Sequence, residues 1–270
     1  MTKLLGVIGD PIAHSLSPII HNGWLRDMGF DATYEAMHVP KGEFTRALKT
    51  LEKRDCLGVN VTLPHKGAAL LAANMVSDAA QKIQAANTLT YLGESEWRAD
   101  NTDAPGFMEA LGRVNPDSDR AVILGAGGSA RAIVHALSVC GVNLAILNRT
   151  VSKAEALAGD LGDENAVGAS IDLYTEYIES ATIIINTTSM GHEGRVLELP
   201  DGRGRTFFDI SYGKISAPQL QHAAEKGWQV KDGLTMLVAQ AAFSFKIWFG
   251  EMPDLDSGLR RCRAALEAVS

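Results

Sequence analysis

The segment RAVILGAGGSARAIVHAL, residues 120–137, decides the fold of this chain. An apolar run of strand length leads into a glycine-rich turn, and a stretch with helical periodicity follows. Gly125, Gly127 and Ala130 fall at the G-x-G-x-x-G/A spacing of dinucleotide-binding folds, in which the glycines permit a tight turn and close approach of the backbone to a pyrophosphate. We therefore predict a dinucleotide-binding loop, and the alternative is a plain turn between a strand and a helix. The predicted loop residues are Gly125, Ala126, Gly127, Gly128 and Ser129.

The next apolar run, NLAILNRT at 143–150, indicates which dinucleotide is bound. Folds that bind NAD usually place an acidic residue about 20 residues past the glycines, where it accepts a hydrogen bond from the ribose 2′-hydroxyl. Here the strand end carries Asn148, Arg149 and Thr150, and Lys153 follows closely. Arginine suits a phosphate because its planar guanidinium donates two parallel hydrogen bonds. These four residues predict NADP, and the alternative is a solvated basic turn.

Apolar runs of strand length recur along the chain, with segments of helical periodicity between them. They lie at 4–8, 57–61, 121–124, 144–147, 182–185 and 206–210. Such alternation predicts an α/β fold with parallel strands and helices on both faces. A polar break near 100–120 and an apolar helical tail predict two lobes. We expect an N-terminal α/β domain at 1–103, completed by C-terminal helices at 238–270, and a Rossmann-type domain with a parallel sheet at 104–237.

The composition excludes several classes of function. The formal net charge is −7, so we expect no nucleic-acid partner. No apolar stretch reaches the roughly 18 residues that cross a bilayer, and the short run after Lys3 is broken by Gly6 and Asp10, so we expect neither a membrane partner nor a signal peptide. The three cysteines are far apart, which favours free thiols in the cytoplasm. No zinc spacing exists, and His14 and His21 are not predicted to bind a metal.

The stretch HSLSPIIH, at 14–21, comes after the first apolar run. Ser17 before Pro18 predicts a helix with Ser17 as its N-cap and an end near Gly29. If the segment is extended, the side chains of Ser15 and Ser17 point the same way while Leu16 points to the core. Two hydroxyls beside a helix N-terminus are suited to a carboxylate. The alternative is that Ser17 is only a cap and Ser15 only a loop residue.

Three polar clusters follow strand-like runs in the N-terminal domain: NVTLPHKGA at 60–68, QAANTLTY at 84–91 and RADNTDAPG at 98–106. Ligands of open α/β sheets bind beyond the carboxyl ends of strands, so we expect Lys66, Asn87 and Asp103 to converge. Their side chains together suit a polyhydroxylated ligand, and a lysine beside a carboxylate can transfer a proton to or from an oxygen atom. Taken singly, each is an ordinary surface lysine or turn residue.

Eight motifs connect these observations: HSLSP, NVTLPHK, AANTL, NTD, GAGGSARA, NRTVSKA, NTTSMG and DGLTMLVAQAA. In this order, and over nearly the whole chain, they resemble the motifs of the shikimate dehydrogenase family. The resemblance implies an NADP-dependent oxidoreductase acting on a CH–OH group, which reversibly reduces 3-dehydroshikimate to shikimate in chorismate and aromatic amino-acid biosynthesis. It also implies that 1–103 with 238–270 binds the substrate and that 104–237 binds NADP.

The resemblance also implies roles for single residues. Lys66 and Asp103 would be the catalytic pair and would contact the substrate. The other substrate-binding residues would be Ser15, Ser17 and Thr62 at the carboxylate, with Asn87, Tyr212 and Gln240. Three further residues, Asp78, Ile210 and Gly233, match positions that approach the cofactor. The segment around Tyr212, SYGKISAPQL, departs from the Tyr-x-Pro pattern frequent in the family.

Two other functions stay open at this point. A quinate/shikimate dehydrogenase using NAD would be favoured by an acidic residue at the NRT position, where there is none. A nucleotide-sensing regulator without catalysis would be favoured by loss of Lys66 or Asp103, and both are present. A homodimer is compatible with the sequence.

Overall fold

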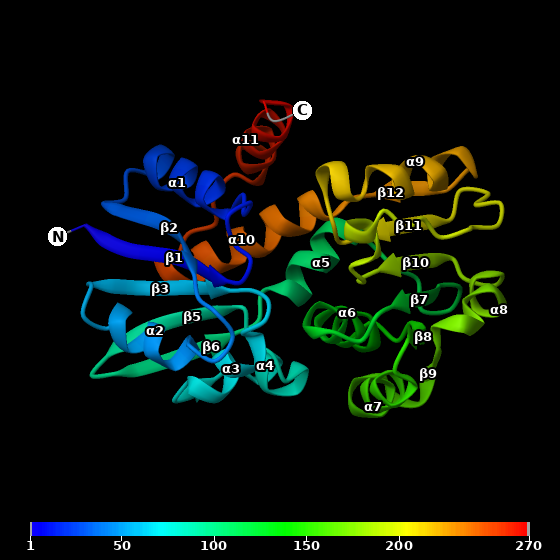
Figure 1. The fold of residues 1–270 in the computed structure, drawn as a ribbon, viewed down its shortest axis with the longest axis horizontal. Coiled ribbons are helices and arrows are strands. Elements are labelled where there is room, and N and C mark those ends of the chain that lie inside the picture. The colour runs from blue at the N-terminus through cyan, green and yellow to red at the C-terminus, as the bar shows by residue number, and fades with distance from the viewer. Residues whose placement is uncertain (1, 269–270) are drawn as a thin grey trace. The chain divides into compact units, whose positions relative to one another are not determined.

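The computed structural model describes residues 2–268 and divides the chain into two compact units (Figure 1). The first unit combines the chain up to Gly106 with the chain from Leu237 onward, and the second unit is Phe107–Met236. Two helices cross the division, α5 (Asp103–Leu111) and α10 (Gly233–Phe249). The first unit is therefore discontinuous in sequence, because its last helices follow the whole of the second unit.

The first unit contains a six-stranded sheet in the order β2-β1-β3-β5-β6-β4. Strand β1 is parallel to β2 and β3, whereas β5 is antiparallel to both β3 and β6. The sheet is thus mixed, and the antiparallel hairpin was not predicted from the sequence. Its strands are β1 (Lys3–Gly9), β2 (Ala32–His38), β3 (Cys56–Val61), β4 (Met75–Val76), β5 (Thr88–Gly93) and β6 (Glu96–Asp100).

The helices of the first unit include two from the end of the chain. Helix α11 packs on α1, where the Trp24 indole N–H donates to the Asp254 carbonyl at 2.8 Å and Arg261 pairs with Asp27 at 2.7 Å. The helices are α1 (Ser17–Met28), α2 (Phe44–Leu51), α3 (Lys66–Ala72), α4 (Asp78–Ile83) and α11 (Leu255–Ala268), together with most of α10. Helix α1 ends where predicted, since Gly29 adopts the left-handed conformation, with φ +73°, that terminates a helix.

The second unit contains a parallel six-stranded sheet in the order β12-β11-β10-β7-β8-β9. This is the doubly wound order, with a switch point between β7 and β10, where such sheets bind ligands. The strands are β7 (Arg120–Leu124), β8 (Asn143–Asn148), β9 (Ala166–Ser170), β10 (Ile183–Asn186), β11 (Thr206–Asp209) and β12 (Gln229–Lys231). The helices are α6 (Gly128–Val139), α7 (Val151–Leu161), α8 (Tyr174–Ile178) and α9 (Ala217–Glu225). The predicted fold class, including the Rossmann-type sheet, is confirmed.

A buried aromatic cluster surrounds His21 in the first unit. The imidazole stacks on the Tyr34 ring, with centroids 4.1 Å apart and planes within 3°, and contacts Trp24, Phe245 and Trp248. Burial lowers the pKa of His21 to about 3. Within the described residues, neither ring nitrogen has a hydrogen-bond partner of normal geometry. His21 is thus a neutral core residue.

Among residues 2–268, no helix has both the length and the apolar character needed to cross a bilayer.

Candidate active site

A buried ion pair lies at the carboxyl end of the first sheet. Lys66 is the first residue of α3, which follows β3, and Asp103 is the first residue of α5, which follows β6. The Lys66 Nζ donates to Asp103 Oδ2 at 2.5 Å, and the two side chains are only 12% and 7% exposed. An ammonium and a carboxylate at this separation can exchange a proton with a ligand oxygen placed beside them.

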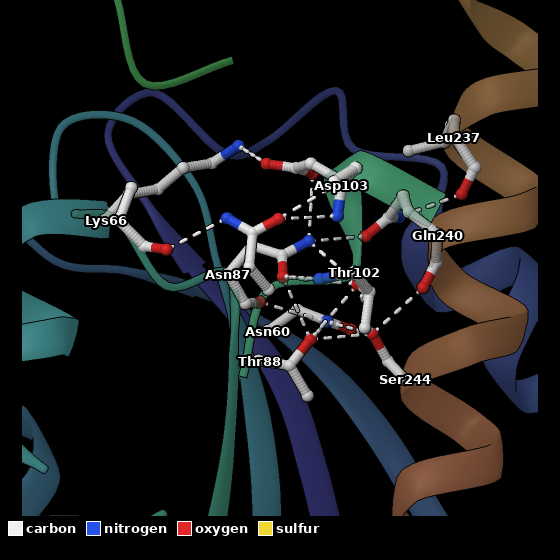
Figure 2. A network of polar contacts seen from close by, with 12 residues as sticks. Asn60, Lys66, Asn87, Thr88, Thr102, Asp103, Leu237, Gln240 and Ser244 are labelled. Atoms are coloured by element: carbon white, nitrogen blue, oxygen red, sulfur yellow. Dashed lines mark hydrogen bonds and ion pairs between the residues drawn. The ribbon is translucent and has the colours of Figure 1, made fainter. Parts of the chain in front are cut away.

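The Asn87 amide holds the other carboxylate oxygen of Asp103 (Figure 2). Its Nδ2 donates to Asp103 Oδ1 at 2.9 Å and to Gln240 Oε1 at 3.1 Å, while its Oδ1 accepts from the Thr102 backbone N–H at 2.7 Å. A carboxylate only accepts and a backbone N–H only donates, so these two contacts fix which way the amide points. The predicted residues Lys66, Asn87, Asp103 and Gln240 therefore form one connected network.

The predicted carboxylate-binding residues follow two neighbouring strands of the first sheet. Ser15 and Ser17 follow β1, Thr62 follows β3, and the pairing of Ile8 with Val61 places these parallel strand ends side by side. The Thr62 backbone N–H donates to the Ile8 carbonyl at 2.9 Å. These three residues therefore follow strands that end on the same side of the sheet as the strand before Lys66.

Two expectations for HSLSPIIH are wrong. Leu16, not Ser17, is the N-cap of α1, and Leu16 is in the right-handed helical region, so 15–17 is not extended. The physical reason is that the Ile19 and Ile20 N–H groups, which a Ser17 cap would bind, donate instead to the Leu16 carbonyl at 3.0 and 3.1 Å, so the helix begins one residue earlier. Instead the Ser15 Oγ accepts from the Ser17 N–H at 3.3 Å. Ser17 is buried against Tyr34, whose pKa is raised by burial and lowered to a smaller degree by Ser17.

The glycine-rich loop of the second unit lies at its switch point, between the end of β7 and the start of α6. Gly125 has φ +108°, and a Cβ there would lie 2.5 Å from Thr187 Oγ1. At Gly127 an added Cβ would meet nothing within 4 Å, so the backbone is open to a ligand. Gly128 and Ser129 form the first turn of α6, whose N–H groups point at the space where an anion binds. Together with Ala126, this loop fits a pyrophosphate.

The predicted 2′-phosphate residues cluster after β8. Arg149, Thr150 and Lys153 are exposed, and the Asn148 Nδ2 donates to the Thr150 carbonyl at 2.9 Å, which shapes the turn before α7. Throughout residues 2–268, neither cation has a salt-bridge partner within 4 Å. Two cations without a carboxylate partner fit an added phosphate better than a bare ribose hydroxyl.

The remaining predicted residues lie in both units. Asp78 is exposed at the start of α4 in the first unit. Ile210, Tyr212 and Gly233 lie in the second unit, where the Gly233 N–H donates to the Ser211 carbonyl at 2.9 Å. A side chain at Gly233 would collide with the Ile210 carbonyl, so this position requires glycine.

Sequence reasoning missed one polar residue of the Lys66 network, Ser244. It lies on α10 and is wholly buried. The signal was its spacing: it falls four residues after Gln240 in a mostly apolar helix, and residues four apart share one helix face.

Comparison with known proteins identifies the family. The chain matches three family models: the shikimate dehydrogenase substrate binding domain at 7–89, shikimate / quinate 5-dehydrogenase at 109–219, and the shikimate 5'-dehydrogenase C-terminal domain at 233–262. It is 49% identical over 272 residues to the shikimate dehydrogenase (NADP(+)) of Hyphomonas neptunium, with 100% of both chains covered.

Solved structures agree with this. The shikimate 5-dehydrogenase of Thermus thermophilus in complex with shikimate is 36% identical with a TM-score of 0.86, covering 98% of this chain and 99% of that one. A second structure of that enzyme, in complex with NADP(H) and shikimate, is 35% identical with a TM-score of 0.85, covering 97% and 99%. By motif, sequence identity and fold, the chain belongs to the shikimate dehydrogenase family.

Proposed function

We propose that this chain is an NADP-dependent shikimate dehydrogenase that reversibly reduces 3-dehydroshikimate to shikimate in aromatic amino-acid biosynthesis. The observation that carries the proposal is the buried Lys66–Asp103 pair, held by Asn87 and Gln240. A proton donor fixed in this way is what the reduction of a ring ketone to an alcohol requires.

In the reductive direction, the Lys66 ammonium donates a proton to the carbonyl oxygen of the substrate as that oxygen becomes a hydroxyl. NADPH, when bound, supplies the hydride that the carbon accepts. Asp103 keeps the ammonium in place, since it accepts hydrogen bonds from Lys66 on one oxygen and from Asn87 on the other. In the oxidative direction, Lys66 takes the hydroxyl proton back.

The substrate carries a carboxylate and ring hydroxyls, and two groups of residues suit them. Ser15, Ser17 and Thr62 offer neutral hydroxyl donors for the carboxylate. Asn87 and Gln240, which already contact each other at 3.1 Å, offer donors and acceptors for ring hydroxyls. We assign Tyr212 to the lining of the same substrate site.

For the cofactor, we assign the pyrophosphate to the glycine-rich loop and the 2′-phosphate to Arg149, assisted by Asn148, Thr150 and Lys153. Asp78, Ile210 and Gly233 complete the cofactor-binding set. On this proposal residues 1–103 with 238–270 form the substrate-binding domain, and 104–237 form the NADP-binding domain. A cytoplasmic location agrees with Cys56 and Cys262, whose burial raises each thiol pKa to about 12 and keeps them unreactive.

The test is to follow NADPH or NADH formation at 340 nm, with shikimate or quinate as substrate and NADP or NAD as cofactor. We expect shikimate with NADP to give the highest kcat/KM. No reduction of NADP by shikimate would contradict the proposed activity. Equal kcat/KM with NADP and NAD would contradict the assignment of Arg149.

A further inference from the structure

The Ser244 hydroxyl projects from α10 into a buried polar cluster of the first unit (Figure 2). Its Oγ is 2.9 Å from Asn60 Nδ2, 2.8 Å from Thr88 Oγ1 and 3.0 Å from Thr102 Oγ1. These partners come from β3, β5 and the loop before α5, whereas Ser244 comes from α10. One hydroxyl thus connects a helix near the end of the chain to three segments that precede the second unit.

The direction of the first hydrogen bond follows from chemistry. Asn60 Nδ2 is 3.1 Å from the Asn87 backbone oxygen, which can only accept, so the Asn60 NH2 group must face that side. Asn60 therefore donates to Ser244, and its Oδ1 accepts from the Tyr34 hydroxyl at 2.7 Å. Ser244 accepts this hydrogen bond and keeps its own proton for another group.

The remaining contacts close a ring. The two N–H groups of Asn87 Nδ2 serve three acceptors, because Thr102 Oγ1 is 2.9 Å away in addition to the Asp103 and Gln240 oxygens. The Thr102 hydroxyl can donate to Ser244 Oγ at 3.0 Å or to Asn87 Oδ1 at 3.2 Å. Ser244 Oγ is 2.8 Å from Thr88 Oγ1, which donates to Asn87 Oδ1 at 3.2 Å. With each hydroxyl donating onward, the ring runs one way from the Asn87 NH2 group back to the Asn87 oxygen, and hydrogen bonds in such a chain strengthen one another. The Gln240 carbonyl, 3.0 Å from Ser244, shares the serine proton with the ring.

We propose that Ser244 is a positioning residue for the reaction, which acts by holding the Asn87 amide. The amide orients Asp103 through Oδ1, and this leaves Oδ2 for the catalytic Lys66. Without the Ser244 hydroxyl, the ring opens, and the buried Asn60 and Thr102 groups lose a partner. The inference rests on the proposed function, because it assigns a residue to that reaction.

The alternative is that Ser244 only stabilises the fold and does not act on Asn87. A buried helical serine often bonds only to the carbonyl four residues earlier, as Ser244 does to Gln240. Its loss would then lower stability without acting through Asn87. The two roles are separated by whether the effect of Ser244 depends on Asn87.

The first experiment measures kcat and KM for Ser244→Ala and for Ser244→Cys, which keeps the shape but has only a weak S–H donor. We expect kcat to fall about tenfold to a hundredfold in both, because small misplacements of catalytic groups have effects of this size, with KM for NADP unchanged. Ser257→Ala is the matched control: Ser257 is a buried serine that bonds to Trp24 Nε1 and the Asp254 carbonyl, and we expect its kcat to stay within about twofold of wild type. A kcat for Ser244→Cys within about threefold of wild type would overturn the proposal.

The second experiment is a double-mutant cycle. In an Asn87→Ala background, Ser244→Ala should lower kcat by no more than about twofold further, because the group on which it acts is already absent. Losses that multiply would show that Ser244 acts independently of Asn87 and would contradict the proposal.

The third measurement does not depend on activity. The Asn87 side-chain NH2 signals, assigned by their loss in Asn87→Ala, should shift and exchange faster with solvent in Ser244→Ala but not in Ser257→Ala. Unchanged signals in Ser244→Ala would refute the ring. If the wild type fails to reduce NADP with shikimate, the proposed function fails, and the NMR result still decides whether Ser244 holds Asn87.

Discussion

Acidification should destabilise the protein through His21. Burial is the main cause of its low pKa, about 3 against 6.5 in an exposed histidine, and Asn60 offsets a small part of the shift. Because the folded pKa is the lower one, the unfolded chain takes up the proton first as the pH falls. The stabilisation is therefore complete above about pH 6.5 and is lost progressively toward pH 3. Tyr34, the titratable group stacked on the ring, remains neutral because burial raises its pKa.

The size of the effect follows from the two pKa values. A difference of 3.5 units, from 6.5 to about 3, corresponds to about 5 kcal/mol over the full range and about 3 kcal/mol at pH 4. We expect the His21→Phe variant to keep this part of its unfolding free energy at low pH, since phenylalanine has no proton to gain. The measurement is urea unfolding of both proteins at pH 7, 6, 5 and 4. Between pH 7 and pH 4, the wild type should lose about 3 kcal/mol more than the variant.

The difference in stability loss between the wild type and His21→Phe does not depend on how well the phenylalanine packs. Phenylalanine is larger than histidine, and overpacking can cost about 1–3 kcal/mol, but that cost is the same at every pH and cancels in the difference. Surface histidines such as His14 and His38 occur in both proteins and cancel too. If the two proteins lose equal stability between pH 7 and pH 4, His21 is not held neutral by burial, and the reasoning is refuted.

Three further predictions concern the proposed site. Lys66→Ala should lower kcat by about 10²–10⁴ while NADP binding, followed by fluorescence, is retained; a kcat within about threefold of wild type would remove Lys66 from the proton transfer. Arg149→Asp should weaken NADP binding about tenfold or more in a calorimetric titration and leave NAD little affected, and an equal loss for both cofactors would contradict the 2′-phosphate assignment. Ser15→Ala and Ser17→Ala should each raise KM for shikimate, because each variant loses a hydrogen bond worth about 1–3 kcal/mol of binding free energy. The wild type should use the methyl ester of shikimate poorly, and equal turnover of acid and ester would rule out a carboxylate site.

The strands that were predicted from the sequence are those buried on both faces. Strands β7, β8 and β10 are parallel and covered by helices, so their sequences are continuous apolar runs. The edge strands β9 and β12 are only partly buried and contain polar or small residues, which give no such pattern. The β5–β6 hairpin was missed because its turn uses Glu94 and Ser95 at positive φ instead of the Asn-Gly pair that usually marks such a turn.

The residues of the candidate site also fall into those that the sequence could predict and those that it could not. Lys66, Asn87 and Asp103 follow strand ends in one domain, so their convergence could be expected from topology. Gln240 lies 153 residues after Asn87, and only the resemblance to a family pointed to it. The spacing of Ser244 from Gln240 indicates only a shared helix face, and the ring itself could not be predicted because the positions of three hydroxyls depend on packing between distant segments.

The discontinuous first unit has a consequence for synthesis of the protein. A ribosome that has made Gly106 must add about 130 more residues before Gln240 exists, which takes between about 7 and about 27 seconds at usual elongation rates. During that interval the continuous second unit can fold, whereas the first sheet lacks α10, whose Trp248 indole N–H later donates to the Leu89 carbonyl. The hydrogen bonds from Asn87 to Gln240 and from Asn60 to Ser244 are completed last, so a chain that stalls before Gln240 lacks both of these supports of the proton-transfer pair.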